Sequence, residues 1–249
     1  MNKRRFKVKN ILLILFIVVF LFSTTKIVLF LFDLRNNKNE TKELIQDVIN
    51  IEIEEEKEVF KIDFEKLLSI NSDTIGWIRF NQDKVNNPIV HTSDNSYYLK
   101  RSFEKKSNQA GAIFMDYRNT SFNDKNVVLF GHAMLDDTMF GSLQDIFKND
   151  FFDTKENNYI QIYNKDNELL TYQIFSYYII EKEEYYITTS FKSDSDFNKF
   201  IDTITKRSYK KFDVEVSTND NILTLSTCSG TGGTSKRKVV HAKRVENLE

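Results

Sequence analysis

A single apolar run near the N-terminus divides the chain into a short basic tail and a long polar remainder. Residues 11–32 are apolar except for Ser23, Thr24, Thr25 and Lys26. As a helix this run would span about 33 Å at ~1.5 Å per residue, close to the thickness of a bilayer's hydrocarbon core. Lys26 lies toward the outer end, where its aliphatic stem can extend to the headgroups. We therefore expect residues 11–32 to form a transmembrane anchor.

Five basic residues precede this run: Lys3, Arg4, Arg5, Lys7 and Lys9. Such clusters remain on the cytoplasmic side of a membrane, so we expect residues 1–10 to be a cytoplasmic tail and the later residues to be extracytoplasmic. A cleaved secretory signal is the alternative. No small-x-small cleavage motif follows the run, which is also longer than a usual signal core. The sequence therefore favours an uncleaved, single-pass protein of the cell membrane.

The segment after the anchor is polar and strongly acidic, with consecutive glutamates at 54–56. Its apolar residues recur at helical spacing, namely Ile45, Val48, Ile49 and Ile53. We expect residues 33–62 to be an acidic stalk or helical linker that lies against a single domain, residues 63–249.

Beyond residue 62, short apolar strands alternate with a few helices. Strand patterns cover residues 126–130, 159–163, 170–180, 222–228 and 238–245, and helical patterns cover residues 64–70, 140–147 and 197–204. Ser193 or Ser195 is the expected N-cap of the last helix. One face of residues 170–180 is expected to carry Leu170, Tyr172, Ile174 and Tyr178. Many short strands with inserted helices predict a mainly β, α+β fold such as a β-barrel.

Composition excludes several classes of function. The formal net charge is −1, so no basic field attracts nucleic acid. The only cysteine is Cys228, which excludes an intramolecular disulfide and a multi-cysteine zinc site. No metal and no cofactor are expected. A lone cysteine is commonly a small buried hydrophobe, but Cys228 ends a strand and leads into the small, glycine-rich residues 229–233, a context that leaves a thiol reachable.

A thiol nucleophile needs a base, and the chain has three histidines. His132 follows an apolar strand, at the kind of strand-to-loop edge where catalytic groups collect. His91 precedes a polar turn and is expected to be an ordinary surface residue. His241 lies within a strand and is expected to be a structural histidine with a satisfied hydrogen bond. His132 is therefore the candidate base.

A developing oxyanion also needs a hydrogen-bond donor. Arg237 begins the last strand, and a hairpin-like return from Cys228 would bring its guanidinium beside the thiol. An arginine at a strand start is commonly a surface charge, and three other basic residues compete for the role: Lys236, Lys238 and Arg244.

Three segments together resemble the class B sortases. The first is residues 87–99, where NPIV leads into DNSYYL. The second is residues 111–143, which contain GAIFMDYRN, FGHAM and MFGSL. The third is residues 224–243, where TLSTC is followed by Arg237 and VVHAK. The resemblance extends from about residue 64 to residue 245.

This resemblance implies an eight-stranded sortase barrel with N-terminal helices and an extra helix, residues 197–204, before the strand leading to the cysteine. It implies that Cys228 attacks the carbonyl after the Thr of a sorting motif similar to NPQTN near the C-terminus of a secreted protein. A peptidoglycan amine would then resolve the acyl-enzyme. His132 would transfer protons, and Arg237 would hold the carbonyl oxygen together with a backbone amide near Thr227 or Cys228.

The resemblance also implies a peptide groove lined by Asn95, Leu99, Tyr186, Ile187, Ser226 and Thr227. Two positions depart from the family pattern. Many class B enzymes carry an acidic residue shortly after the cysteine, whereas Ser229 and Gly230 follow here. Phe130 stands where a tyrosine often precedes Gly-His, which removes one hydroxyl. Neither departure affects the Cys228 thiol, the His132 imidazole or the Arg237 guanidinium.

Other interpretations fit the residues less well. An L,D-transpeptidase would place its cysteine in a Ser-x-Gly-Cys context with arginine almost adjacent, unlike this chain. A non-catalytic, membrane-anchored binding domain would require coincidence at all three segments. Within the sortases, a pilin-polymerising enzyme remains the alternative to one that anchors proteins to the cell wall.

Overall fold

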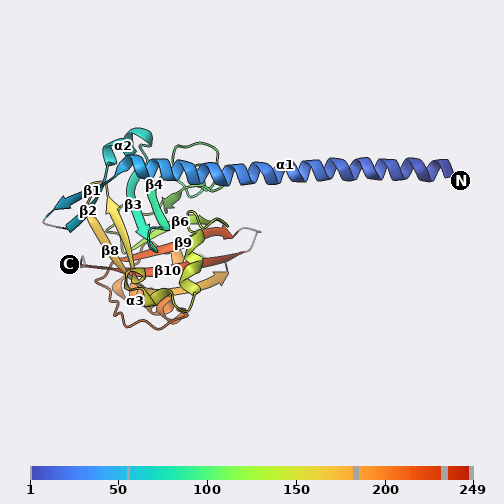
Figure 1. The fold of residues 1–249 in the computed structure, drawn as a ribbon. Helices are drawn as coiled ribbons and strands as arrows, with labels where there is room; N and C mark the ends of the chain where they lie inside the picture. Colours follow the sequence, from blue (N-terminus) through green and yellow to red (C-terminus); the bar gives the residue numbers. More distant parts are fainter. Residues whose placement is uncertain (1, 55–56, 182–184, 231–234, 247–249) are drawn as a thin grey trace.

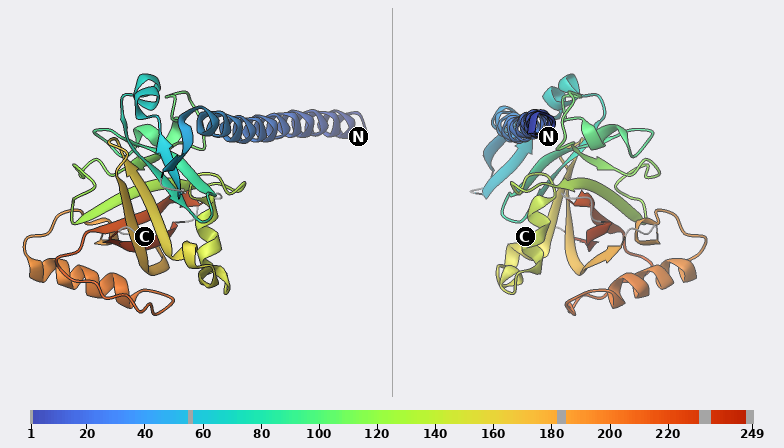
Figure 2. Two further views of the ribbon diagram at one scale, coloured as in Figure 1. Left: turned by 60° about the vertical axis from the view of Figure 1, so that its left-hand side comes forward. Right: turned by 90° about the vertical axis from the view of Figure 1, so that its right-hand side faces the viewer.

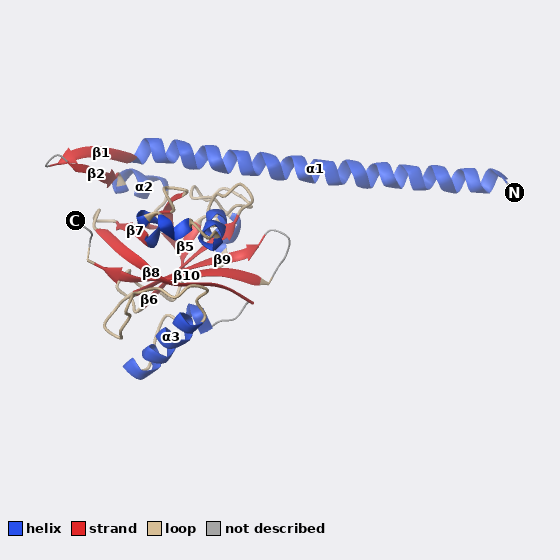
Figure 3. Cartoon of the chain, turned by 60° about the horizontal axis from the view of Figure 1, so that its bottom comes forward, coloured by secondary structure: helices blue, strands red, loops and turns tan. Residues whose placement is uncertain are grey.

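Eight strands close into a barrel in the order β10-β8-β7-β3-β4-β5-β6-β9. The computed structural model describes residues 2–54, 57–181, 185–230 and 235–246. The barrel strands are β3 (Thr74–Phe80), β4 (Val85–His91), β5 (Ile113–Met115), β6 (Asn126–Ala133), β7 (Tyr159–Asn164), β8 (Leu169–Glu181), β9 (Ile222–Gly230) and β10 (Lys236–Val245). The predicted barrel with inserted helices is confirmed (Figures 1 and 3).

The N-terminal helix α1 (Asn2–Val48) projects far beyond the barrel (Figure 1). Among the described residues it is the one helix long and apolar enough to cross a membrane, over Lys9–Phe32, and that stretch packs against nothing. Its last turns contact the domain, where Leu44, Ile45 and Val48 join a cluster with Phe64 and Leu67 of α2 (Phe64–Ile70). The helix therefore enters the domain without an unstructured linker.

The expected helical linker is wrong beyond Val48. Residues 49–62 form an antiparallel hairpin of β1 (Ile49–Glu54) and β2 (Lys57–Ile62), in which Ile49 pairs with Ile62. The segment INIEIE alternates apolar and polar residues, a period that favours a strand. The turn between β7 and β8 holds the hairpin, because the Asn167 side chain accepts from the Ile62 amide and donates to the Ile62 carbonyl, both at 3.0 Å.

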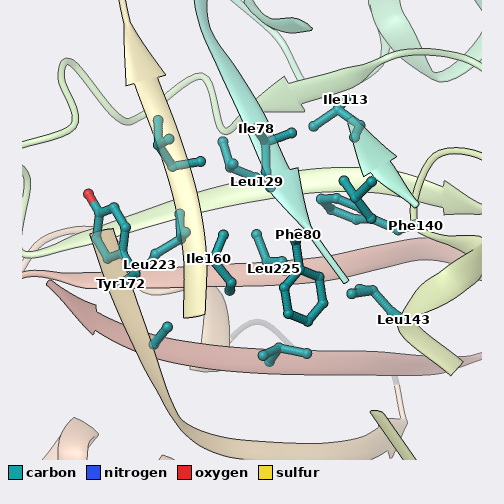
Figure 4. Close-up of a cluster of buried hydrophobic side chains, with 14 of the residues drawn as sticks. Ile78, Phe80, Ile113, Leu129, Phe140, Leu143, Ile160, Tyr172, Leu223 and Leu225 are labelled. Atoms are coloured by element: carbon teal, nitrogen blue, oxygen red, sulfur yellow. The ribbon is translucent and has the colours of Figure 1, made fainter. Parts of the chain in front are cut away.

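Alternation along the barrel strands separates an inner face from an outer face. Val127 and Leu129 of β6 point inward, as do Leu223 and Leu225 of β9, and all four are fully buried. They pack with Ile78, Phe80, Ile160, Tyr172 and Phe140 between the strands (Figure 4). Phe130 of β6 packs in a different cluster, on the outer side. The inner face of these strands is thus apolar.

A bulge in β8 moves one predicted core residue to the outer side. Ser176 pairs with His241, but Ile174 pairs with Ala242, so one residue of β8 is left over. Leu170, Tyr172 and Ile174 consequently face the barrel interior as expected, whereas Tyr178 packs outside. The expectation that all four share a face is wrong.

Helix α3 (Asp194–Lys206) covers this outer cluster, on the side of the barrel away from α1 (Figures 1 and 2). Its N-cap is Ser193, whose side chain accepts from the amide of Asp196. Four buried side chains at i, i+3, i+4 and i+7 spacing face the barrel: Phe197, Phe200, Ile201 and Ile204. The predicted helix and one of its two expected caps are confirmed.

The helix predicted over residues 140–147 is a 3₁₀ helix, η2 (Gly141–Phe147), at one end of the barrel. Its buried Asp145 accepts hydrogen bonds from Asn81 at 3.0 Å and Lys84 at 2.5 Å, and pairs with Lys148 at 2.6 Å. Burial raises the pKa of Asp145, but these bonds outweigh it and lower the pKa to about 2. The carboxylate therefore ties η2 to the β3–β4 turn.

We predict that Asp145→Asn lowers the free energy of unfolding at pH 7 by about 2 kcal/mol, because charged hydrogen bonds are lost at a buried site. A carboxylate with a depressed pKa stabilises the fold above its unfolded pKa of about 4. That contribution is lost as pH falls through about 2. Urea unfolding of both proteins across this pH range measures it. The exposed Asp153→Asn is the control, and an equal gap between Asp145→Asn and wild type at pH 7 and pH 2 would contradict the assignment.

Candidate active site

The ends of three neighbouring strands bring the predicted catalytic residues together. β6 and β9 run parallel, with Gly131 opposite Thr227 and Ala133 opposite Gly230. The register shifts between these two pairs, which places the backbone of His132 beside the stretch of β9 that contains Cys228. β10 runs antiparallel to β9, with Val239 opposite Ser226. Continued by two residues, this register would place Arg237 opposite Cys228.

Cys228 is described by its main chain, within β9. Its side chain, that of Ser229, and residues 231–234 lie outside the described part of the chain. The expected accessibility of the thiol therefore stays a prediction.

His132 is held by a backbone carbonyl. Its ring Nε2 lies 2.7 Å from the Leu99 oxygen, in the short helix η1 (Tyr97–Lys100). Because a carbonyl only accepts, Nε2 must carry a proton, and in the neutral ring Nδ1 is then the acceptor. The ring is half-buried.

Gly111 supports the same contact. Its φ of +64° is a conformation that L side chains rarely adopt. A Cβ at this position would lie 2.6 Å from the Tyr98 oxygen, 3.1 Å from the Leu99 oxygen and 3.1 Å from His132 Cδ2. The loop before β5 can therefore pack against the imidazole only with glycine at position 111, and sequence reasoning assigned no role to this residue.

Arg237 is half-buried at the start of β10. Within the described residues, its guanidinium donates to nearby carbonyls, those of Ser235 at 3.3 Å and Lys236 at 3.4 Å. Among the described carboxylates, none lies within ion-pair distance of it. Alternation places Arg237 on the outer face with Val239, while Val240 faces inward.

Two of the competing basic residues share a cavity with Arg237. Lys236, Arg237 and Lys238 all line a cavity of about 280 Å³ at the barrel end, and burial lowers the pKa of Lys238 while Asp137 opposes that shift. Lys236 is exposed. Arg244 is at the far end of β10, bonded to Asn123 at 2.7 Å and paired with Glu168 at 3.5 Å.

The predicted groove residues come from three parts of the chain. Asn95 and Leu99 lie on the η1 side. Tyr186 and Ile187 lie on the other side, in η5 (Tyr185–Ile187). The Tyr186 hydroxyl is 3.0 Å from Ser226 Oγ, and both residues are buried.

Thr227 is also buried, and its hydroxyl accepts from the Lys238 amide at 3.0 Å. Phe130, which stands in the tyrosine position, packs on Phe114 with ring centroids 5.4 Å apart. Its ring thus forms part of the apolar packing near His132.

The remaining histidines lie away from these strand ends. His91 is half-buried in β4, rather than on the open surface. His241 is fully buried and hydrogen-bonded on both ring nitrogens, to the Tyr178 hydroxyl at 2.8 Å and the Thr224 hydroxyl at 2.9 Å. Burial, and to a lesser degree Arg207, lowers the pKa of His241 to about 3. Its predicted structural role is confirmed.

Comparison with known proteins identifies this arrangement. The Sortase domain family matches residues 79–245. The curated Sortase B of Staphylococcus aureus is 33% identical over 248 residues, 98% of each chain. The chain belongs to the sortase family. A crystal structure of sortase B from B. anthracis is 34% identical to this sortase, with a TM-score of 0.75. The match covers 87% of this sortase and the whole of the B. anthracis chain.

The sortase in the Staphylococcus aureus sortase B–substrate complex is 37% identical, with a TM-score of 0.68. That match covers 74% of this chain and 85% of the S. aureus chain. The resemblance to class B drawn from residues 87–99, 111–143 and 224–243 is thus confirmed. As a class B sortase, the protein is a cysteine transpeptidase.

The hydrogen bonds predict opposite tautomers for two histidines of this sortase. The Thr224 hydroxyl donates to Asn126 at 2.7 Å, so it accepts from His241 Nδ1–H, and Nε2 of His241 accepts from Tyr178. Neutral His132 is instead protonated on Nε2. Imidazole ¹⁵N chemical shifts at pH 8 distinguish the two forms. Observation of the same tautomer at both residues would contradict the geometry.

Proposed function

We propose that this sortase cleaves a C-terminal sorting motif of secreted proteins after a threonine and joins the released carbonyl to a peptidoglycan amine. The observation that supports this most is the meeting of His132, Cys228 and Arg237 at the adjacent ends of β6, β9 and β10. A motif similar to NPQTN is the proposed substrate, by resemblance to class B sortases. The sulfur of Cys228 is the proposed nucleophile.

The first half of the reaction forms a thioester. The Cys228 thiol first gives its proton to Nδ1 of His132. The thiolate sulfur then bonds to the carbonyl carbon after the motif threonine, and the carbonyl electrons move to oxygen. Arg237 and a backbone amide near Thr227 or Cys228 stabilise this oxyanion. When the C=O re-forms, the C–N bond breaks, and His132 donates a proton to the departing amine.

The second half transfers the acyl group. The incoming amine attacks the thioester carbon, His132 removes its proton, and the C–S bond breaks to regenerate Cys228. Because the Leu99 carbonyl holds Nε2–H, Nδ1 is the nitrogen through which His132 exchanges protons. The same carbonyl keeps the ring oriented through both halves.

The proposed setting follows from the chain's organisation. Residues 11–32 are the proposed anchor, residues 1–10 a cytoplasmic tail, residues 33–62 an acidic linker and residues 63–249 the extracytoplasmic catalytic domain. The apolar stretch Lys9–Phe32 is consistent with a membrane anchor. The proposed partners are secreted proteins with C-terminal sorting signals and an amine of the peptidoglycan precursor or stem peptide. Internally quenched peptides of the forms NPxTx and PPxTG distinguish cell-wall anchoring from pilin polymerisation.

Replacing the nucleophile tests the mechanism. We expect Cys228→Ala to abolish cleavage of a quenched sorting peptide, a loss of at least about 4 kcal/mol of transition-state stabilisation by analogy with other covalent enzymes. Circular dichroism should show an unchanged fold. In the wild type, a small thiol-reactive sulfonate should label Cys228 in the folded protein and abolish turnover. Appreciable turnover by Cys228→Ala would exclude the cysteine mechanism.

A second prediction assigns the oxyanion to Arg237. We expect Arg237→Ala to lower kcat about 10²–10³-fold and Arg237→Lys to retain little activity, since an ammonium cannot reproduce the planar fork. The matched controls Lys236→Ala, Lys238→Ala and Arg244→Ala should stay within about threefold of wild type, because strand alternation turns Lys236 and Lys238 to the opposite face from Arg237 and Arg244 lies at the far end of β10. Steady-state kinetics on one peptide compares all five. A near-normal Arg237→Ala with a crippled neighbour would refute the assignment.

A further inference from the structure

A fully buried carboxylate lies between the two sides of the predicted groove. Asp116 directly follows β5 and has no exposed surface. Its oxygens accept from Arg118 Nε at 2.8 Å and Nη2 at 2.7 Å, and from the Arg118 amide at 2.9 Å. Asp116 also accepts from the Asn95 side chain at 3.1 Å. Asn95 in turn accepts from the Tyr117 amide at 3.0 Å, so its position on the η1 side depends on this carboxylate.

Arg118 extends the connection to the other side. Its Nη2 also donates to the Ile187 carbonyl, at 2.8 Å. Residues 186–188 have two further attachments to the barrel. Asn126 donates to the Thr188 carbonyl at 2.8 Å, and the Tyr186 hydroxyl contacts Ser226. Asp116 and Arg118 thus link Asn95 to Ile187 across the outer face of β6.

The linkage lies away from the reacting groups. The Asp116 amide donates to the Val128 carbonyl at 2.9 Å, and Val128 precedes His132 by four residues on β6, a separation of about 13 Å at ~3.3 Å per residue. An extended peptide covers that distance with about four residues. Neither side chain can therefore act on the scissile bond, but both can act on the walls that would receive the motif's first residue.

We propose that Asp116 and Arg118 are positioning residues that set the separation of the groove walls and thereby the affinity for the N-terminal part of the sorting motif. This inference rests on the proposed function. The planar guanidinium satisfies Asp116 with two parallel bonds while reaching Ile187, an arrangement that a lysine ammonium cannot reproduce. The bonds from Arg118 and Asn95 outweigh the effect of burial and keep the pKa of Asp116 below its ordinary value, so the carboxylate remains charged.

The substitution Arg118→Lys tests the proposal without removing charge, and the side chain is 36% exposed, which favours correct folding. We expect KM for a sorting peptide to rise about tenfold with kcat within twofold of wild type, because only substrate binding is weakened. A peptide that lacks the residue four positions before the scissile bond should show equal KM for Arg118→Lys and wild type. Unchanged KM on the full motif, or a fall in kcat alone, would overturn the proposal.

The chain provides a matched control in Arg79→Lys. Arg79 forms the same two-bond pair with Asp83, at 2.8 Å and 2.6 Å, on β3 outside the groove. We expect Arg79→Lys to keep wild-type KM, and an equal rise in both variants would overturn the proposal by showing a general effect of losing such a pair. Failure of the wild type to cleave any sorting peptide would instead refute the proposed function. Cleavage by the wild type with normal KM for Arg118→Lys would refute only the positioning role.

Discussion

The parallel pairing of β6 with β9 is the constraint on which the site depends. It closes the barrel between two strands that are distant in sequence, and it brings their carboxyl ends to the same edge. The antiparallel return through β10 adds the start of a third strand. The strand ends that carry His132, Cys228 and Arg237 therefore lie side by side because of sheet topology. Their local sequences alone would not bring them together.

Apolar packing fixes the face of this sheet on which the proposed catalytic residues lie. Val127, Leu129, Leu223 and Leu225 are fully buried on the inner face. A slip of one residue in either strand would turn these side chains outward and carry the polar residues into the core, at a cost of roughly 1.5–3 kcal/mol for each exposed side chain. The interior thus maintains the register from which the positions of His132 and Arg237 follow.

On the outer face, a buried network of hydrogen bonds also fixes the strands relative to one another. His241 connects Tyr178 of β8 to Thr224 of β9, and Thr224 connects to Asn126 of β6. Removal of any partner would leave a buried polar group unsatisfied, at a cost of roughly 1–3 kcal/mol. Asn126 also donates to the Thr188 carbonyl, so the network that fixes the strands also holds one wall of the predicted groove. Neutral His241 serves this purpose because it donates on one nitrogen and accepts on the other.

Sequence reasoning predicted what depends on periodicity and resemblance. The strands that carry His132, Cys228 and Arg237, and helix α3 with its Ser193 cap, are where the pattern placed them. Residues 49–62 were assigned to a helix because isoleucines at 45, 49 and 53 also fit helical spacing, and the deciding bonds come from Asn167, far along the chain. The bulge in β8 has no marker in its apolar run.

Contacts between distant loops were equally hidden, since nothing in the sequence shows that Gly111 would meet His132 or that Arg118 would reach Ile187. Distant contacts also connect the N-terminal helix to His132, the proposed catalytic histidine. Leu44, Ile45 and Val48 of α1 pack in one cluster with Tyr98, and Leu99 packs against that cluster. The Leu99 carbonyl in turn holds His132. The orientation of the imidazole is therefore connected, through η1, to the apolar packing of the helix that leads to the predicted anchor.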